Sequence, residues 1–401
     1  MRGDLLRAAG DDTTAAIEWW GTAGQRSMAR YALVEGAEQL KRALDQIATL
    51  PATPALRREE IKLHVAFANA LTLTGDFVEA KSTTTGRSRI YDSAEHGSLT
   101  TRSGRDIKVA LLASRSGCAW LLGYPAAARS DAARAVKNAR EIEHATTLLH
   151  ALHLSEWNHI RCGNYAVAHT QVDELIALAD QRGAPGWKAL GTATRGCLFA
   201  LTGKASEAVR AITSAITLLP STGAALYEPQ QLQYLAMAYA ELGQLHDAWR
   251  CIDDAIDKTE KSKEKWCEAE VHRIAGEVEL KSLAPDPEKA EAYFDHALAV
   301  ARQQQAKSWE LRAAMSMARL WRDQALKRIR SATAVFDSRN SELISAIATT
   351  PTGPLMRKHH CQEKLSAIRR AVDCIGKWPS LSFTRLKKSP GKSRAGARKP
   401  L

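Results

Sequence analysis

Apolar residues recur along most of this sequence at a helical spacing, three or four positions apart. Ala248, for example, is followed by Ile252, Ala255 and Ile256, and the same pattern follows the alanine 40 residues earlier. Such spacing places the apolar side chains on one face of an α-helix. The composition agrees, because Ala, Leu, Glu, Lys, Arg and Gln dominate and long β-branched runs are absent. The sequence therefore predicts an all-α protein.

A motif of glycine, four residues and alanine recurs along the chain with a regular period. Complete copies begin at five glycines, and the last four of these glycines are spaced by 40 residues each. The copies are Gly75 to Ala80, Gly123 to Ala128, Gly163 to Ala168, Gly203 to Ala208 and Gly243 to Ala248, and a variant without the glycine ends at Ala290. A period of this length is typical of helical repeat proteins.

Each repeat is predicted to consist of two amphipathic helices joined by a tight turn. The glycine would end the first helix in the left-handed conformation, where the Cβ of any other residue meets a steric clash. The alanine would lie where the two helices cross, since its small side chain allows a close approach. One such hairpin cannot bury its apolar face alone, so neighbouring hairpins must stack. We predict a tetratricopeptide-like α-solenoid of helix-turn-helix repeats with a period of about 40 residues.

An aromatic residue marks the start of four successive repeats, at Trp187, Tyr227, Trp266 and Trp309. Each stands in the first turn expected for the first helix of its repeat. We interpret these residues as packing against the preceding repeat, in preference to stacking on a ligand.

The repeat pattern divides the chain into three parts, with one irregular stretch inside the solenoid. The parts are an N-terminal segment at 1–14, the solenoid at 15–324, and a non-repeat basic tail at 325–401 that we expect to be disordered from about 380. Ala325 and Arg330 stand where the next glycine and alanine would fall. The irregular stretch is expected at 81–105, because Thr83, Thr84, Thr85 and Gly86 are poor helix formers.

The net charge of +12 is concentrated in the tail. Residues 325–401 carry 17 Lys and Arg against 4 Asp and Glu, whereas the rest of the chain carries 39 against 40. Any attraction to nucleic acid must therefore come from the tail.

The repeat region resembles a known family in its amino-acid sequence as well as in its period. The stretches "YAELGQLHDAW", "KWCEAEVHRIAGEVEL" and "AKSWELRAAMSMARLWRDQ" are similar to the C-terminal repeat region of bacterial class III adenylate/guanylate cyclases fused to a regulatory ATPase. In that family the region serves as a sensor or partner-binding solenoid. No cyclase aspartate motif or ATPase motif can be placed in this chain. We therefore expect a non-enzymatic protein without a cofactor.

A partner groove is predicted where the first helices of the repeats share one face. By analogy with tetratricopeptide solenoids, such a groove would take a peptide or a helix of another protein. The alternative reading of the same residues is a solvated helix face. The predicted groove residues are His150, His153, Trp157 and Arg161 of one repeat and Gln230, Gln233 and Met237 of a later one.

Metal binding and disulfides are not predicted. His150, His153, Glu156 and His159 recur at three-residue steps, which spreads them around a helix instead of gathering them on one face. The seven cysteines are scattered singly, as reduced cysteines are.

The sequence as a whole predicts a protein-protein interaction or regulatory scaffold related to adenylate cyclase signalling proteins. The alternatives are a nucleic-acid-associated protein that binds through 325–401, and an eroded cyclase-family fragment. No stretch of 18 uncharged apolar residues and no leader-like start is present, so we expect a cytoplasmic protein without a membrane span. The sequence leaves the oligomeric state open.

Overall fold

The computed structural model describes residues 13–88, 105–219 and 227–348, with side chains described except at 87–88 and beyond 331. Contacts divide the chain into two units, Met1–Leu326 and Lys327–Leu401, and the helical hairpins all belong to the first. All regular elements in the described ranges are helical, in agreement with the predicted all-α solenoid.

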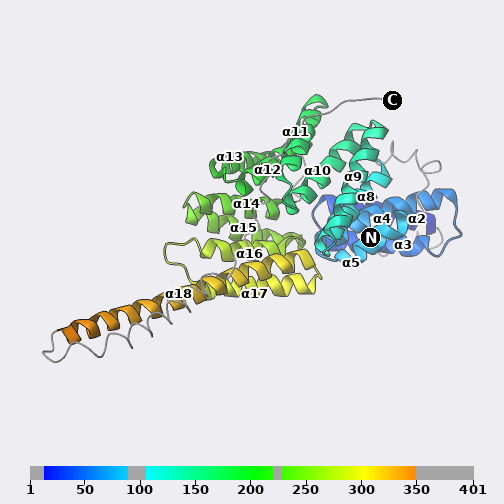
Figure 1. The fold of residues 1–401 in the computed structure, drawn as a ribbon. Coiled ribbons are helices and arrows are strands. Elements are labelled where there is room, and N and C mark those ends of the chain that lie inside the picture. The colour runs from blue at the N-terminus through cyan, green and yellow to red at the C-terminus, as the bar shows by residue number, and fades with distance from the viewer. Residues whose placement is uncertain (1–12, 89–104, 220–226, 349–401) are drawn as a thin grey trace, which may run out of the picture. The chain divides into compact units, whose positions relative to one another are not determined.

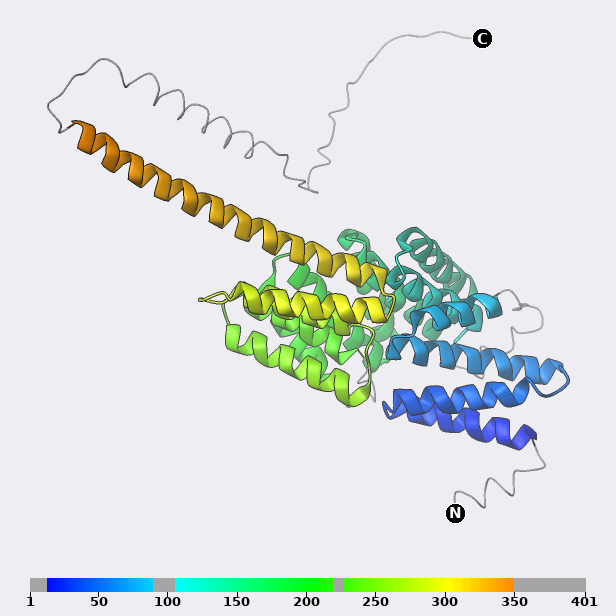
Figure 2. The same ribbon diagram turned by 90° about the horizontal axis from the view of Figure 1, so that it is seen from below.

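The helices form successive antiparallel hairpins (Figures 1 and 2), and each hairpin contacts the next. The hairpins are α2 (Thr13–Ala29) with α3 (Leu33–Ile47), α4 (Pro54–Thr74) with α5 (Phe77–Ser88), α8 (Ile107–Leu121) with α9 (Pro125–Ile142), α10 (Ala145–Arg161) with α11 (Tyr165–Gln181), α12 (Pro185–Leu201) with α13 (Ala205–Leu218), α14 (Glu228–Glu241) with α15 (Leu245–Ser262), and α16 (Glu268–Glu279) with α17 (Pro287–Gln303). Helix α18 (Lys307–Ala348) follows the last hairpin.

The repeat glycines end the first helices of their hairpins. At Gly243, φ is 73°, and the Gln244 N–H donates to the carbonyl oxygen of Tyr239 at 2.9 Å, which satisfies a carbonyl at the helix end. All five repeat glycines have φ between 73° and 95°. The repeat alanines are fully buried between the paired helices: Ala80, Ala128, Ala168, Ala208, Ala248 and Ala290.

Helix α5 corrects the expectation of an irregular stretch from residue 81. The helix continues to Ser88 and includes Thr83 to Gly86. The Thr84 hydroxyl donates to the carbonyl oxygen of Ala80 at 3.0 Å, and both residues are fully buried together with Phe77. Packing against the hairpin partner therefore outweighs the low helix propensity of the threonines. Residues 89–104 lie outside the described residues.

Late hairpins contact early ones directly. The Lys265 N–H donates to the carbonyl oxygen of Leu73 on α4 at 2.8 Å. The Trp309 ring of α18 lies edge-on against Trp120 of α8, with centroids 4.8 Å apart, and the Ser308 hydroxyl donates to the Trp120 carbonyl oxygen. The first helices of the repeats thus face one another across a common inner surface.

Glycines allow the closest of these approaches. A Cβ on Gly75 would come within 2.9 Å of the Gln304 side chain, and one on Gly123 within 3.0 Å of Lys307. The turns of the second and third hairpins therefore lie directly against the segment that enters α18.

Helix α18 is continuous through the position where the repeat pattern ends. It runs past Ala325 to Ala348, so the first part of the predicted non-repeat tail is helical. The predicted disorder from about 380 lies outside the described residues. Among the described helices, none is long and apolar enough to cross a membrane.

Candidate functional site

The predicted groove residues belong to two helices, α10 and α14. His150, His153, Gln230 and Gln233 are only 1 to 8 % exposed. These four side chains are therefore not a solvated face, and they are not exposed in an open groove either. Met237 is partly buried at the edge of the same surface.

Ring contacts bring α10 and α14 together. His153 meets Tyr227 with ring centroids 5.8 Å apart, and Trp157 meets Tyr234 at 6.0 Å. Trp187, at the start of the intervening α12, lies edge-on to His153 at 6.1 Å. Trp187 thus packs on the preceding repeat as predicted, whereas Tyr227 reaches two hairpins back. We call the surface formed by α10, α14, α16 and the start of α18 the inner face.

Several buried polar atoms on the inner face find no hydrogen-bond partner among the described residues. Such an atom costs about 1–3 kcal/mol unless a partner satisfies it. The atoms combine acceptors and imidazole nitrogens, which are the groups that a polar ligand can engage. They are Nδ1 of His150, Nε2 of His153, Oε2 of Glu156 and Oε1 of Gln230, Gln231 and Gln233.

Burial also sets the charge of these groups. Burial and then Arg105 and His153 hold the pKa of His150 well below its ordinary value. The pKa of Glu156 is raised by burial, although the hydrogen bond with His153 at 3.0 Å opposes the shift. Burial in the centre of the inner face therefore disfavours the charged forms of His150 and Glu156.

Arg161, at the end of α10, is a cation in an aromatic cage. Its guanidinium carbon lies 5.0 Å from the Trp266 ring centroid, 5.4 Å from that of Trp120 and 5.8 Å from that of Trp157. In the described part of the chain no carboxylate forms an ion pair with Arg161, and its Nε is buried without a partner. Burial lowers the pKa of the guanidinium. The cage holds a positive charge that a ligand anion could neutralise.

A charged network continues the inner face onto α16 and α18. Arg273 donates from Nε and Nη2 to both carboxylate oxygens of Glu270 at 2.8 Å, and Arg312 adds a second ion pair with Glu270 at 2.7 Å. Burial alone would raise the pKa of Glu270, but Arg273 and then Arg312 lower it. The Ser316 hydroxyl donates to Glu277, which also accepts from Arg273.

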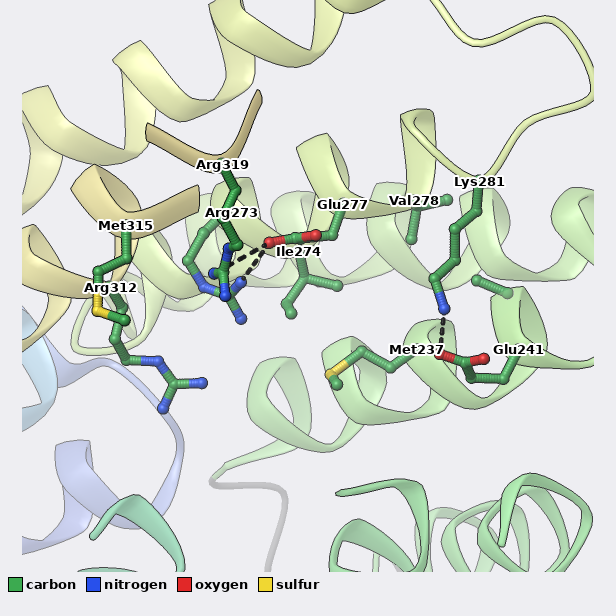
Figure 3. A pocket seen from close by; sticks show the side chains of 11 residues that line it. Met237, Glu241, Arg273, Ile274, Glu277, Val278, Lys281, Arg312, Met315 and Arg319 are labelled. Carbon is green, nitrogen blue, oxygen red and sulfur yellow. Dashed lines mark hydrogen bonds and ion pairs between the residues drawn. The ribbon is translucent and has the colours of Figure 1, made fainter. Parts of the chain in front are cut away.

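A pocket of about 400 Å³ opens beside this network (Figure 3). Its lining combines an apolar floor with four basic side chains, of which Lys281 pairs with Glu241. The main lining residues are Met237, Ile274, Val278 and Met315 as the apolar part, and Arg273, Lys281, Arg312 and Arg319 as the basic part. The pocket can hold an apolar side chain next to an anionic group.

Sequence reasoning missed the part of the inner face that lies beyond Met237. The Glu270–Arg273 pair is visible in the sequence as an acid and a base three residues apart on one helix. That spacing is common on exposed helices, and only burial distinguishes this pair.

The histidines considered for metal binding do not gather around one point. His150 and His153 both lie against Trp187, and His153 bonds to Glu156, but these residues form no group of three ligand atoms within 4.8 Å among the described residues. A different set, Glu268, His272 and His296, places its ligand atoms within 4.8 Å of one another. The sequence signal for that set was the i, i+4 spacing of Glu268 and His272.

Comparisons with known proteins show the fold. No protein-family model matches the chain, and no curated protein matches its sequence. A solved structure of a Rap protein complexed with competence and sporulation factor is similar at a TM-score of 0.56 and 13 % identity, covering 76 % of this chain and 81 % of that one. NprR in complex with its cognate peptide NprX is similar at a TM-score of 0.51 and 11 % identity, covering 78 % and 92 %. The chain is thus a tetratricopeptide-like helical repeat protein.

Proposed function

We propose that this protein is a non-catalytic regulatory scaffold that binds a peptide on its inner face. The observation that carries the proposal is the row of buried, unpartnered polar atoms from His150 on α10 to Gln233 on α14. These atoms are costly in a chain that binds nothing there.

A peptide suits this surface because its backbone offers alternating donors and acceptors. Because these glutamines are buried, a peptide would have to open the contacts between α10 and α14 to reach them. The side-chain amides of Gln230, Gln231 and Gln233 could then each exchange two hydrogen bonds with one peptide unit. The neighbouring rings of Trp157 and Tyr234 offer apolar area for peptide side chains.

The charges of the inner face favour a ligand with an anionic group. No carboxylate of the described residues lies within ion-pair distance of Arg161. The pocket beside Met237 has four basic side chains, which pair with the three carboxylates of Glu241, Glu270 and Glu277. The C-terminal carboxylate of a peptide, or an acidic side chain, would neutralise Arg161. Binding in the cage would exclude water and so strengthen the ion pair.

The comparisons support this reading at the level of architecture. The similar Rap and NprR structures were solved with a factor and a cognate peptide, respectively. The resemblance of the sequence to cyclase-ATPase repeat regions supports the finer proposal that the scaffold is a sensor in cytoplasmic signal transduction.

A second candidate function rests on the charge of residues 325–401. Lys327, Arg328 and Arg330 are exposed on α18, and the tail carries 17 basic residues against 4 acidic ones. Such a tail would bind DNA or RNA through phosphates, with an affinity that falls steeply with salt. Deleting 325–401 would abolish this binding and leave peptide binding intact.

The test is selection from a pool of synthetic heptapeptides with free carboxylates, followed by titration of the tryptophan fluorescence of the full chain. Trp120, Trp157 and Trp266 surround Arg161, so they report occupancy directly. We expect Gln233→Leu to weaken the selected peptides at least tenfold and Gln303→Leu, an exposed position on α17, to leave them unchanged. Equal binding of the selected peptides by both variants contradicts the proposal. A pool from which no peptide binds also contradicts it, and this is the result expected of an eroded fragment.

A further inference from the structure

Two imidazoles and a carboxylate converge on the last hairpin, away from the residues of the inner face. Glu268 and His272 lie one turn apart on α16, and His296 lies on α17. The ligand atoms of the three side chains are within 4.8 Å of one another, and the two histidine rings have centroids 4.1 Å apart. Neighbouring imidazoles at this distance repel each other when protonated.

The packing of the hairpin holds the two helices at this separation. A Cβ on Gly276, one turn after His272, would come within 2.4 Å of the Phe294 ring. Phe294 is fully buried and stands two residues before His296. The backbones that carry the two histidines therefore cannot move apart without opening the core between α16 and α17.

The three side chains are free to act as ligands. Nδ1 of His272 is buried without a hydrogen-bond partner in the described part of the chain. The carboxylate of Glu268 forms no ion pair with any described residue. His296 is exposed, which gives an ion a path from solvent.

We propose that Glu268, His272 and His296 bind a divalent transition metal ion, with Zn²⁺ as the best match. Two imidazoles and one carboxylate form a known zinc ligand set with an open fourth position, whereas Mg²⁺ and Ca²⁺ prefer oxygen ligands. Tetrahedral zinc bonds of about 2.1 Å place ligand atoms about 3.4 Å apart. The ligand atoms, now within 4.8 Å of one another, would therefore have to approach by up to about 1.4 Å to bind the ion.

The bound ion would link α16 to α17 by a short bridge. It would stabilise the hairpin because only the folded chain brings the three ligands together. Glu268 and His272 share α16 with Glu270 and Arg273 of the inner face, but none of the three ligands lines the pocket or belongs to the predicted groove residues.

The test is isothermal titration of the reduced full chain with Zn²⁺. The double variant His272→Ala/His296→Ala should lose one equivalent of bound zinc, or bind it at least tenfold more weakly. His246→Ala, an exposed histidine of α15, should bind as the wild-type chain does. Zinc held by cysteines is the same in all three chains and cancels in the comparison, and His246→Ala measures the effect of removing an unrelated exposed histidine.

Two further measurements keep the result decisive. Titration with Co²⁺ should give the visible absorption bands of a four- or five-coordinate ion in the wild-type chain and lose them in the double variant. If the double variant misfolds by circular dichroism, the exposed single variant His296→Ala takes its place. Equal zinc stoichiometry and affinity in the wild-type and variant chains overturns the proposal.

Discussion

The indole of Trp309 on α18 meets the indole of Trp120 on α8 edge-on, with ring centroids 4.8 Å apart. The Trp309 Nε1–H also donates to the carbonyl oxygen of Trp266 at 3.0 Å, and the side chain is 2 % exposed. This relationship joins the third hairpin to the helix that follows the last hairpin, and Arg161 of α10 lies against the rings of Trp120 and Trp266. The contact therefore holds together the surface that we propose binds a peptide.

Removing this contact should destabilise the chain strongly. Trp309→Ala deletes a buried aromatic side chain and leaves a cavity, so we expect the free energy of unfolding to fall by about 3–5 kcal/mol. Trp321→Ala, on the same helix but 53 % exposed, should cost less than about 1 kcal/mol. Urea denaturation of both variants measures the difference. Similar losses of unfolding free energy at the two positions would show that the Trp120 contact stabilises the chain no more than an exposed tryptophan does.

Gly243, a repeat glycine, and Gly117, a glycine inside a helix, should respond in opposite directions to alanine. Gly243 has φ 73° and open space where a Cβ would stand, so Gly243→Ala should cost about 1–2 kcal/mol through backbone strain alone. Gly117 lies inside α8 and also has free space around it. Gly117→Ala should therefore stabilise the chain by up to about 1 kcal/mol. Thermal unfolding of the pair checks the prediction, which fails if both changes have the same sign.

Glu264 should make the stability of the chain depend on pH. Burial raises the pKa of this carboxyl from 4.5 to about 7, and Glu228 adds to the rise, although hydrogen bonds from Trp266 and the Tyr227 N–H oppose it. The folded state therefore holds the proton more tightly than the unfolded state. The resulting stability is complete below the unfolded pKa and is lost as pH rises to about 7, with a loss of about 3 kcal/mol.

Glu264→Gln tests this assignment because the amide oxygen keeps both hydrogen bonds but does not titrate. Unfolding free energies measured from pH 4 to 8 should fall less steeply in the variant than in the wild-type chain. Parallel curves for the two chains would mean that Glu264 does not titrate in this range.

Arg161 should decide which end group the ligand carries. In the wild-type chain a selected peptide with a free carboxylate should bind at least tenfold more tightly than the same peptide with an amidated end. Arg161→Met keeps a long apolar side chain in the cage but removes the charge, so it should abolish this preference. Fluorescence titration of both peptides against both chains measures it. A preference that survives in Arg161→Met would assign the carboxylate to another cation.

The sequence predicted the local elements well because local rules determine them. Gly243 ends α14 in the left-handed conformation, and Ala248 is fully buried at the helix crossing, since a tight turn and a close approach leave few other choices. The helical state of Thr84 was not predicted, because it depends on packing that a propensity does not contain. The Trp120–Trp309 contact was not predictable either, since it depends on small rotations that accumulate over several hairpins.

In the candidate site, too, the sequence predicted local placement but not long-range packing. The sequence placed His153 and Gln233 on facing helices, because the forty-residue period fixes which helices share a face. It did not indicate that they are buried with unpartnered atoms, nor that Arg161 lies among three tryptophans. Both features arise where early and late hairpins meet.

The most direct test of peptide binding on the inner face is hydrogen–deuterium exchange of the full chain with and without a selected heptapeptide. If the peptide lies there, exchange should slow in α10, α14 and α16 and stay unchanged in the partner helices α11, α13 and α15. Protection confined to those partner helices, or to residues 325–401, would contradict binding on the inner face.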